Sequence, residues 1–251
     1  MRITYAGIYD ELVPLPEHEV VFYHSILRSR LFPEERVLIT PSTTGRLAIA
    51  LAKQGFYCTG VDLDPEMTAV ALEKRAALPP ELQARLRFVT GDMRRLGEPG
   101  PFGAIVVPER GLLCLDEDSR QEAVLGFSRR LRLAGALVFD LSKRKEAPLF
   151  CYNTEFQAPW KREHRLLVCE AVEKVGGNGH LIQHIKVLEL GAGGDLIRSE
   201  HISLDLHFPA ADSIGKALKR GRFTAWRLFG DLYCRQGQEE DDYEIWIANR
   251  R

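Results

Sequence analysis

Two aspartates follow stretches of sequence that have the pattern of buried β-strands. Asp62 comes after residues 56–61, and Asp92 comes after residues 85–90 and one glycine. Parallel strands place their carboxyl ends along one edge of a sheet, and open α/β sheets bind ligands at that edge. A carboxylate there can accept hydrogen bonds from two hydroxyls at once, which suits a ribose diol. Asp62 therefore predicts a binding position for a nucleoside.

The stretch from Val37 to Asp62 has the pattern of half a nucleotide-binding βαβ unit. Residues 37–39 form an apolar run of buried-strand type, and Pro41 keeps the following turn from being helical. Gly45 then opens a helix that ends at Gly55, a residue type typical of C-caps. The apolar stripe of this helix consists of Leu47, Ala48, Leu51 and Ala52.

Composition limits the classes of partner. The chain has 251 residues, with 34 basic and 35 acidic side chains. Such a balance gives no electrostatic reason to expect nucleic acid or an anionic membrane, so a small-molecule substrate is expected. No apolar run reaches the roughly 18 residues of a membrane-spanning helix, and the first residues lack the apolar core of a secretory signal. The length favours one elaborated domain.

Cysteine and loop patterns narrow the chemistry. The five cysteines are scattered and odd in number, which argues against a disulfide framework and predicts a cytoplasmic location. No His or Cys spacing typical of zinc is present, so no metal is expected. The loop Ser42-Thr43-Thr44-Gly45 lacks the lysine of a phosphate-binding loop, which argues against an NTPase, and the GxGxxG of a dehydrogenase is also missing.

Strand and helix patterns alternate through the first 141 residues. Asp64 and Pro65 predict a helix start directly after Asp62. Further predicted elements are a helix at residues 17–30, a strand at 102–107, a loop and helix over 112–133 capped by Asp118 or Ser119, and a strand at 135–141. The alternation predicts an α/β, Rossmann-like fold with a mostly parallel sheet and helices on both faces. The ligand edge then carries residues 40–45, Asp62, Asp92, Glu109 and Asp140.

Near Cys151 the pattern changes to extended segments separated by glycine-rich turns. The segments are residues 164–174, 180–190 and 195–206. Short turns imply antiparallel pairing, so an inserted β-meander is expected as a cap or as the surface of a homodimer. A helix at 211–220 and strands at 223–228 and 243–248 follow. The predicted units are residues 1–150, a cofactor-binding core with an N-terminal lid helix; 151–206, the insertion; and 207–251, which completes the core sheet.

Several motifs resemble those of class I S-adenosylmethionine-dependent methyltransferases, within them the small-molecule branch that has a β insertion after the fifth strand. They are Tyr9-Asp10-Glu11-Leu12 and the segments 44–55, 59–67, 88–96, 135–141 and 229–231. The resemblance covers nearly the full length of the chain. The segments TGVDLDPEM and FVTGDMRRL are fairly specific when they occur together.

The resemblance implies S-adenosylmethionine as cofactor and methyl transfer to a small molecule as function. Asp62, with Leu63 beside it, would hold the ribose hydroxyls, and Asp92 would hold the adenine amino group, with Met93 beside the ring. The methionine end of the cofactor would lie against Thr43, Thr44 and Gly45.

The first loop departs from the family's pattern. Ile39 stands where the family has an acid, and Pro41 and Thr43 stand where it has glycines. Glycines let the backbone turn sharply next to the ligand, and Pro41 also removes an N–H donor. Ile39 cannot bond the ammonium group of the cofactor. The sequence therefore supports the fold of this family more strongly than it supports binding of the cofactor.

Two functions remain open from sequence. In the first, the enzyme methylates nitrogen, oxygen or carbon of a small acceptor, which needs mainly alignment and exclusion of water. The acceptor's proton must still leave, and Tyr9, Glu109 and His207 are the candidate catalytic bases. In the second, the donor site is lost and the scaffold is a binding or regulatory module, or an enzyme of another chemistry. Asp62 and Asp92 favour methyl transfer.

Overall fold

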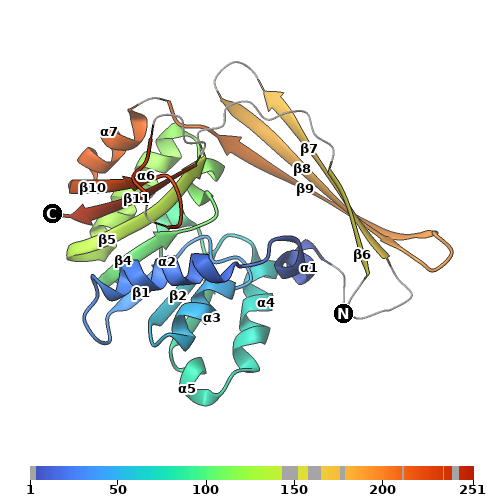
Figure 1. Cartoon of the computed structure of the whole chain (residues 1–251), viewed down its shortest axis with the longest axis horizontal. Coiled ribbons are helices and arrows are strands. Elements are labelled where there is room, and N and C mark those ends of the chain that lie inside the picture. Colours follow the sequence, from blue (N-terminus) through green and yellow to red (C-terminus); the bar gives the residue numbers. More distant parts are fainter. Residues whose placement is uncertain are drawn as a thin grey trace.

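Seven strands form a mostly parallel central sheet in the order β10-β11-β5-β4-β1-β2-β3 (Figure 1). The structure is a computed structural model that describes residues 4–142, 152–157, 165–175, 179–210, 212–233, 235–238 and 243–251. The strands are β1 (Arg36–Ile39), β2 (Tyr57–Asp62), β3 (Leu86–Thr90), β4 (Phe102–Val107), β5 (Leu131–Ser142), β10 (Phe223–Phe229) and β11 (Tyr243–Arg250). The first five pair in parallel, whereas β11 is antiparallel to both β5 and β10. The predicted mixed sheet is confirmed.

Helices cover both faces of this sheet. They are α2 (Glu17–Arg28), α3 (Arg46–Lys53), α4 (Pro65–Ala76), the short α5 (Pro80–Gln83), α6 (Glu117–Arg130) and α7 (Ser213–Arg220), with 3-10 turns η1 (Met93–Arg95) and η2 (Gly111–Cys114). Residues of α2, α3 and α4 share one hydrophobic cluster, and residues of α6 and α7 share another. Val37 and Ile39 belong to the first cluster and Leu38 to the second, as alternation along a buried strand requires. Within the described residues, no helix combines the length and the apolar character needed to cross a bilayer.

Most predicted element boundaries agree with the structure, and one cap was wrong. The four residues of the predicted apolar stripe of α3 are all buried, and the Asp64 side chain accepts a hydrogen bond from the N–H of Glu66 at the start of α4. The cap of α6 is Asp116, which accepts from the N–H of Ser119 at 2.8 Å, and neither Asp118 nor Ser119 holds that position. Asp116, Asp118 and Ser119 are all residue types that cap helices. Which of them is the N-cap of α6 depends on where η2 ends, and η2 ends at Cys114.

A second sheet of four antiparallel strands extends from the core (Figure 1). Its strands are β6 (Tyr152–Gln157), β7 (Arg165–Val175), β8 (His180–Leu190) and β9 (Leu196–His207), paired in sequence order. The predicted meander had three strands and lacked β6. Residues 152–157 contain no run of apolar residues that would predict a strand. They form β6 because they pair with β7. The predicted unit boundary at residue 151 lies outside the described residues.

An additional helix, α1 (Tyr5–Leu12), lies between the core and this sheet (Figure 1). Ile8 is fully buried and belongs to one cluster with four residues of the antiparallel sheet, namely Leu166, Val168, Ile185 and Val187. The backbone N–H of Tyr5 donates to Glu200 of β9 at 2.8 Å. On the core side, the Asp10 carboxylate accepts from the Thr44 hydroxyl and pairs with Lys74 of α4. Helix α1 therefore joins the two sheets.

We expect Ile8→Ala to lower the free energy of unfolding by about 2–4 kcal/mol, because it leaves a cavity at the only fully buried side chain of α1. The measurement is urea denaturation, with limited proteolysis of the antiparallel sheet as a second readout. Val21→Ala is the control, since Val21 of α2 is 54% exposed and should change stability by less than about 0.5 kcal/mol. Equal stability of the two variants would contradict the described docking of α1.

Candidate active site

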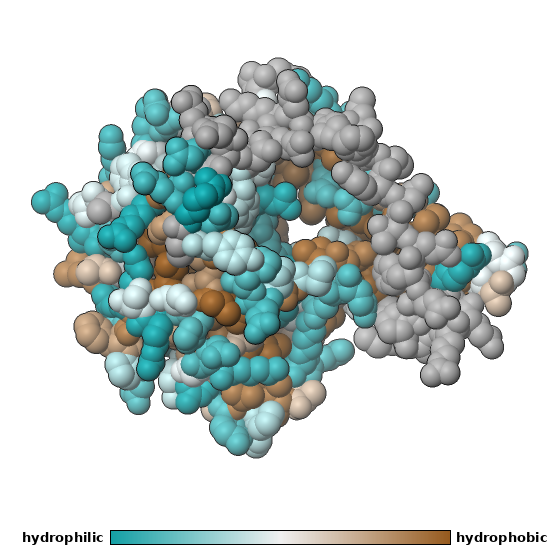
Figure 2. Space-filling view, in the orientation of Figure 1, coloured by the Kyte–Doolittle hydropathy of each residue, from teal (hydrophilic) through white to brown (hydrophobic). Residues whose placement is uncertain are grey.

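A cavity of about 810 Å³ opens at the carboxyl ends of the parallel strands. Figure 2 shows the hollow between the core and the antiparallel sheet, with hydrophobic atoms along part of its edge. Predicted site residues that line it are Tyr9, Thr43, Asp62, Leu63, Asp92, Met93, Glu109 and His207. Thr44 and Gly45 do not line it. They shape the loop beneath it.

The first loop turns sharply without the usual glycines. Thr43 adopts the left-handed conformation at φ +46°, and Gly45 does so at φ +77°. A Cβ at Gly45 would lie 2.7 Å from the Phe88 ring, so only glycine fits there. Left-handed backbone costs a β-branched residue such as Thr43 on the order of 1–2 kcal/mol. The loop thus retains the shape of a glycine-rich turn, and its strain is concentrated at a residue that lines the cavity.

Asp62 fastens this loop to the end of β2. Its Oδ2 accepts from the N–H of Thr43 at 2.6 Å, and its Oδ1 accepts from the N–H of Asp64 at 3.0 Å. Burial raises the pKa of Asp62, against the lowering effect of these two N–H groups. Each oxygen still has acceptor capacity, because a carboxylate offers about four lone-pair sites.

Asp92 begins η1 and is paired locally. Its carboxylate accepts from the backbone N–H of Arg94 and takes both Nε and Nη2 of the Arg94 guanidinium, at 2.6 to 3.0 Å. These hydrogen bonds lower the pKa of Asp92. The sequence did not reveal Arg94 as its partner. Met93 and Leu63 lie beside the two aspartates in the cavity wall, and Leu63 is 68% exposed, unusual for a leucine of a core loop.

Glu109, Arg46 and Tyr9 form a charged group at the side of the first loop. The Glu109 carboxylate accepts from Arg46, with Nε at 3.2 Å and Nη2 at 2.5 Å, and from the Tyr9 hydroxyl. The guanidinium also lies 5.1 Å above the Tyr9 ring centre. Burial and the adjacent Glu109 charge raise the pKa of Tyr9 far above its ordinary range. Tyr9 therefore keeps its proton at neutral pH and acts as a donor.

Two more acids lie behind this group. Asp140, at the end of β5, is almost fully buried and accepts from the N–H of Arg110 at 3.0 Å. Burial raises the pKa of Asp140 to about 6, although the Arg110 N–H and the Tyr243 hydroxyl act in the opposite direction. Burial, with the charges of Glu109 and Asp140, raises the pKa of Glu19 to about 7.

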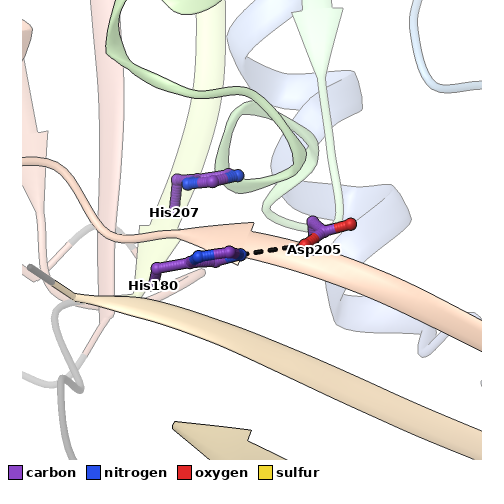
Figure 3. A group of neighbouring side chains, drawn as sticks. All are labelled: His180, Asp205 and His207. Atoms are coloured by element: carbon purple, nitrogen blue, oxygen red, sulfur yellow. Dashed lines mark hydrogen bonds and ion pairs between the residues drawn. The ribbon is translucent and has the colours of Figure 1, made fainter. Parts of the chain in front are cut away.

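His180, Asp205 and His207 lie next to one another on β8 and β9 (Figure 3), and Asp205 and His207 line the cavity. His180 and His207 are cross-strand partners of β8 and β9, with ring centres 4.3 Å apart and planes 14° from parallel. The Nε2 of His180 lies 2.8 Å from Asp205 Oδ1. A metal ion lies in the plane of each imidazole that binds it, so rings stacked in this way do not point at one ion. Burial, and then His180, lower the pKa of His207, which keeps the His207 imidazole neutral at pH 7.

The cavity is strongly acidic although the chain is nearly neutral. Among the described residues, one arginine, Arg94, lines it, together with eight carboxylates: Asp62, Asp64, Glu66, Asp92, Glu109, Asp116, Glu200 and Asp205. Sequence analysis missed the contribution of β9, where Glu200, Ile202 and Leu204 face the cavity at every second residue. That period-two pattern is visible in the sequence, but which face is internal depends on how the sheet docks. Such a site suits a cationic ligand.

The strand order, the reversed last strand and the acids after β2 and β3 together define the fold of class I methyltransferases. Residues 37–135 match a family described as a methyltransferase domain. YqeM of Bacillus subtilis (strain 168), provisionally named as a methyltransferase, is 30% identical over 159 residues, which are 60% of this chain and 59% of YqeM. The chain thus matches little more than half of that relative's length.

Solved structures match nearly the whole chain. The sugar N-methyltransferase KedS8 from Streptoalloteichus sp ATCC 53650 has a TM-score of 0.79 at 18% identity, over 100% of this chain and 94% of its own. CalS10, an amino pentose methyltransferase from Micromonospora echinaspora solved with S-adenosylmethionine bound, has a TM-score of 0.73 at 18% identity, over 100% and 98%. With the family match, this shared fold confirms the resemblance to class I S-adenosylmethionine-dependent methyltransferases.

The raised pKa of Asp140 predicts a stability cost at neutral pH. Because its pKa is about 6 when folded and 3.8 ordinarily, the native state binds the proton more tightly than the unfolded chain. Its stabilising contribution is complete below pH 3.8 and is lost as pH rises through 6, a change of about 3 kcal/mol.

The difference in unfolding free energy between wild type and Asp140→Asn, measured by denaturation from pH 4 to pH 7, should therefore shift in favour of the variant as pH rises. Asp195→Asn, at an exposed turn, is the matched control and should show a constant difference. A flat profile for Asp140→Asn would refute the buried, protonatable state.

Proposed function

We propose that this protein transfers a methyl group from S-adenosylmethionine to a small-molecule acceptor. The observation that carries the proposal is the acidic cavity with Asp62 and Asp92 at neighbouring strand ends. S-adenosylmethionine is a sulfonium cation, and the excess of carboxylates favours a ligand of that charge. The names of KedS8 and CalS10 support a sugar-like acceptor of the same class.

The residues present fit the nucleoside part of this cofactor. Asp62 would accept from the ribose hydroxyls, since each of its oxygens has one protein donor and capacity for another. Asp92 would accept from the adenine amino group while Arg94 holds its carboxylate in place. Leu63 and Met93 would contact the ring, and Thr43 and Gly45 would shape the turn under the methionine end. When bound, the cofactor supplies an electrophilic methyl group on sulfur.

In this reaction the protein would align the methyl donor with the acceptor and exclude water from the cavity. Helix α1 and strand β9 enclose the cavity on the side away from the parallel strands. We propose the antiparallel sheet as the wall of the acceptor site. Pairing of two copies through this sheet remains a prediction.

We infer an amine as the acceptor. Asp116, Glu200 and Asp205 lie in the wall around η2 and β9, where they would bind an ammonium group and would oppose an alkoxide. The ammonium must lose its proton before its nitrogen attacks. His207 is the candidate base that is held neutral, whereas Tyr9 is held as a donor and Glu109 is paired with Arg46.

A second function retains specific support. The side chains of Arg46, Glu109 and Tyr9 lie together where the family's methionine site is expected, and the Thr43 N–H already bonds Asp62. A protein with its donor site closed in this way would use the cavity for binding or regulation, or for another chemistry. Titration with the cofactor distinguishes the two functions.

We expect calorimetric titration to give micromolar dissociation constants for S-adenosylmethionine and S-adenosylhomocysteine, roughly −8 kcal/mol. Asp62→Asn should weaken both at least tenfold, because an amide cannot accept through both of its terminal atoms. Asp195→Asn should bind as wild type. Absence of binding to wild type at millimolar ligand would exclude the first function and favour the second.

For the acceptor site, we expect wild type to methylate members of a panel of amino sugars and small amines when supplied with methyl-labelled S-adenosylmethionine. His207→Gln should lower kcat by about 100-fold or more, with unchanged cofactor affinity and loss of the acid limb of the pH profile. His201→Gln, on the exposed face of β9, should keep the wild-type rate. A wild-type pH profile in His207→Gln would remove His207 as the base.

A further inference from the structure

The first loop leaves the charged tail of the cofactor without its usual partner. Ile39 ends β1 where the family has an acid, and its side chain is 1% exposed, within the hydrophobic cluster. None of residues 40–45 of this loop has an acidic side chain. An ammonium group placed here would be desolvated without a counter-charge, which is costly.

The neighbouring strand supplies a carboxylate beside this gap. Ile39 of β1 pairs with Val106 of β4, and Glu109 follows three residues later, beyond the same edge of the sheet. Its side chain lines the cavity. The loop after β4 also packs on the first loop, since a Cβ at Gly111 would lie 2.3 Å from Pro41 Cδ. Pro41, which replaces a family glycine, therefore helps to bring Glu109 close.

The backbone at Glu109 is strained in a way that argues for function. Glu109 and Arg110 have φ of +59° and +57°, so two consecutive residues with a Cβ adopt the left-handed conformation. Such conformations persist where surrounding contacts enforce them, and they concentrate at ligand sites. Here the turn directs the Arg110 N–H to Asp140 and the Glu109 carboxylate to Arg46 and Tyr9.

The hydrogen bonds that Glu109 accepts within the protein leave it capacity for a donor group of a ligand. Glu109 accepts three protein hydrogen bonds, and a carboxylate offers about four lone-pair sites. Arg46 spends Nε and Nη2 on Glu109, while its buried Nη1 has no hydrogen-bond partner among the described residues. Arg46 does not line the cavity, so it positions the Glu109 carboxylate from behind. The ammonium group of an amino-acid tail is a cationic donor that suits the remaining acceptor capacity of Glu109.

We infer that Glu109 replaces the acid missing from the end of β1 and binds the ammonium group of the donor's amino-acid tail, while Arg46 holds the Glu109 carboxylate in position. The inference rests on the proposed function. The tail site has thus moved from β1 to the loop after β4, and the altered residues of the first loop are compensated.

Ligands that differ only in the tail test this inference on the wild-type protein. S-adenosylhomocysteine should bind at least tenfold more tightly than its deaminated analogue and than 5′-methylthioadenosine, which lacks the tail. Glu109→Gln should bind S-adenosylhomocysteine at least tenfold more weakly, bind 5′-methylthioadenosine within twofold of wild type, and no longer discriminate against the deaminated analogue. The amide oxygen introduced by Glu109→Gln can still accept from Arg46, so the fold should persist.

Asp195→Asn is the control, because it neutralises an exposed acid that does not line the cavity and should leave these affinities unchanged. Equal wild-type affinities for S-adenosylhomocysteine and the deaminated analogue would overturn the inference while the proposed function stands. Failure of wild type to bind any of the three nucleosides would overturn the proposed function and the inference with it.

Discussion

The Asp62 carboxylate is the contact on which the geometry of the site depends. It accepts one N–H from the loop after β1 and one from the loop after β2, so it joins two turns that the sheet alone would leave independent. Buried charge-assisted hydrogen bonds of this type are strong and directional. Thr43 keeps its left-handed backbone under this constraint, and the loop retains its shape although two of the family's glycines are missing.

A second set of contacts joins the core to the antiparallel sheet. Helix α1 buries Ile8 in the antiparallel sheet and ties Asp10 to Thr44 of the first loop. The same helix places Tyr9 against Glu109. One short helix thus sets the position of a wall of the cavity and of a side chain within it, so the antiparallel sheet and the core line a single cavity.

Sequence reasoning succeeded where structure is determined locally. The turn chemistry of Asp64 and Pro65 and the apolar runs of β1 and β4 specify their own elements, and parallel pairing then places Asp62 and Asp92 at one edge. Helix α1 was not predicted from the sequence, because its buried residues contact strands about 160 positions away in the chain. Its two following prolines and acidic residues resemble those of a loop.

The site itself was predictable only in part, for the same reason. Asp62, Asp92 and Glu109 line the cavity as their positions after strands suggest. The group of His180, Asp205 and His207 arises from the register of β8 on β9, which no spacing rule along the chain detects. Likewise, the pairing of Arg46 with Glu109 joins the first residue of α3 to the end of β4, 63 positions apart, and depends on how Pro41 packs on Gly111.

The double attachment of α1 has a thermodynamic consequence. A ligand that displaced β9 from the core would strain the Tyr5 to Glu200 hydrogen bond, and through α1 that strain would reach the Thr44 contact. Coupling of this kind between the two ends of the cavity is reciprocal by linkage. Its physical connection is a helix of eight residues.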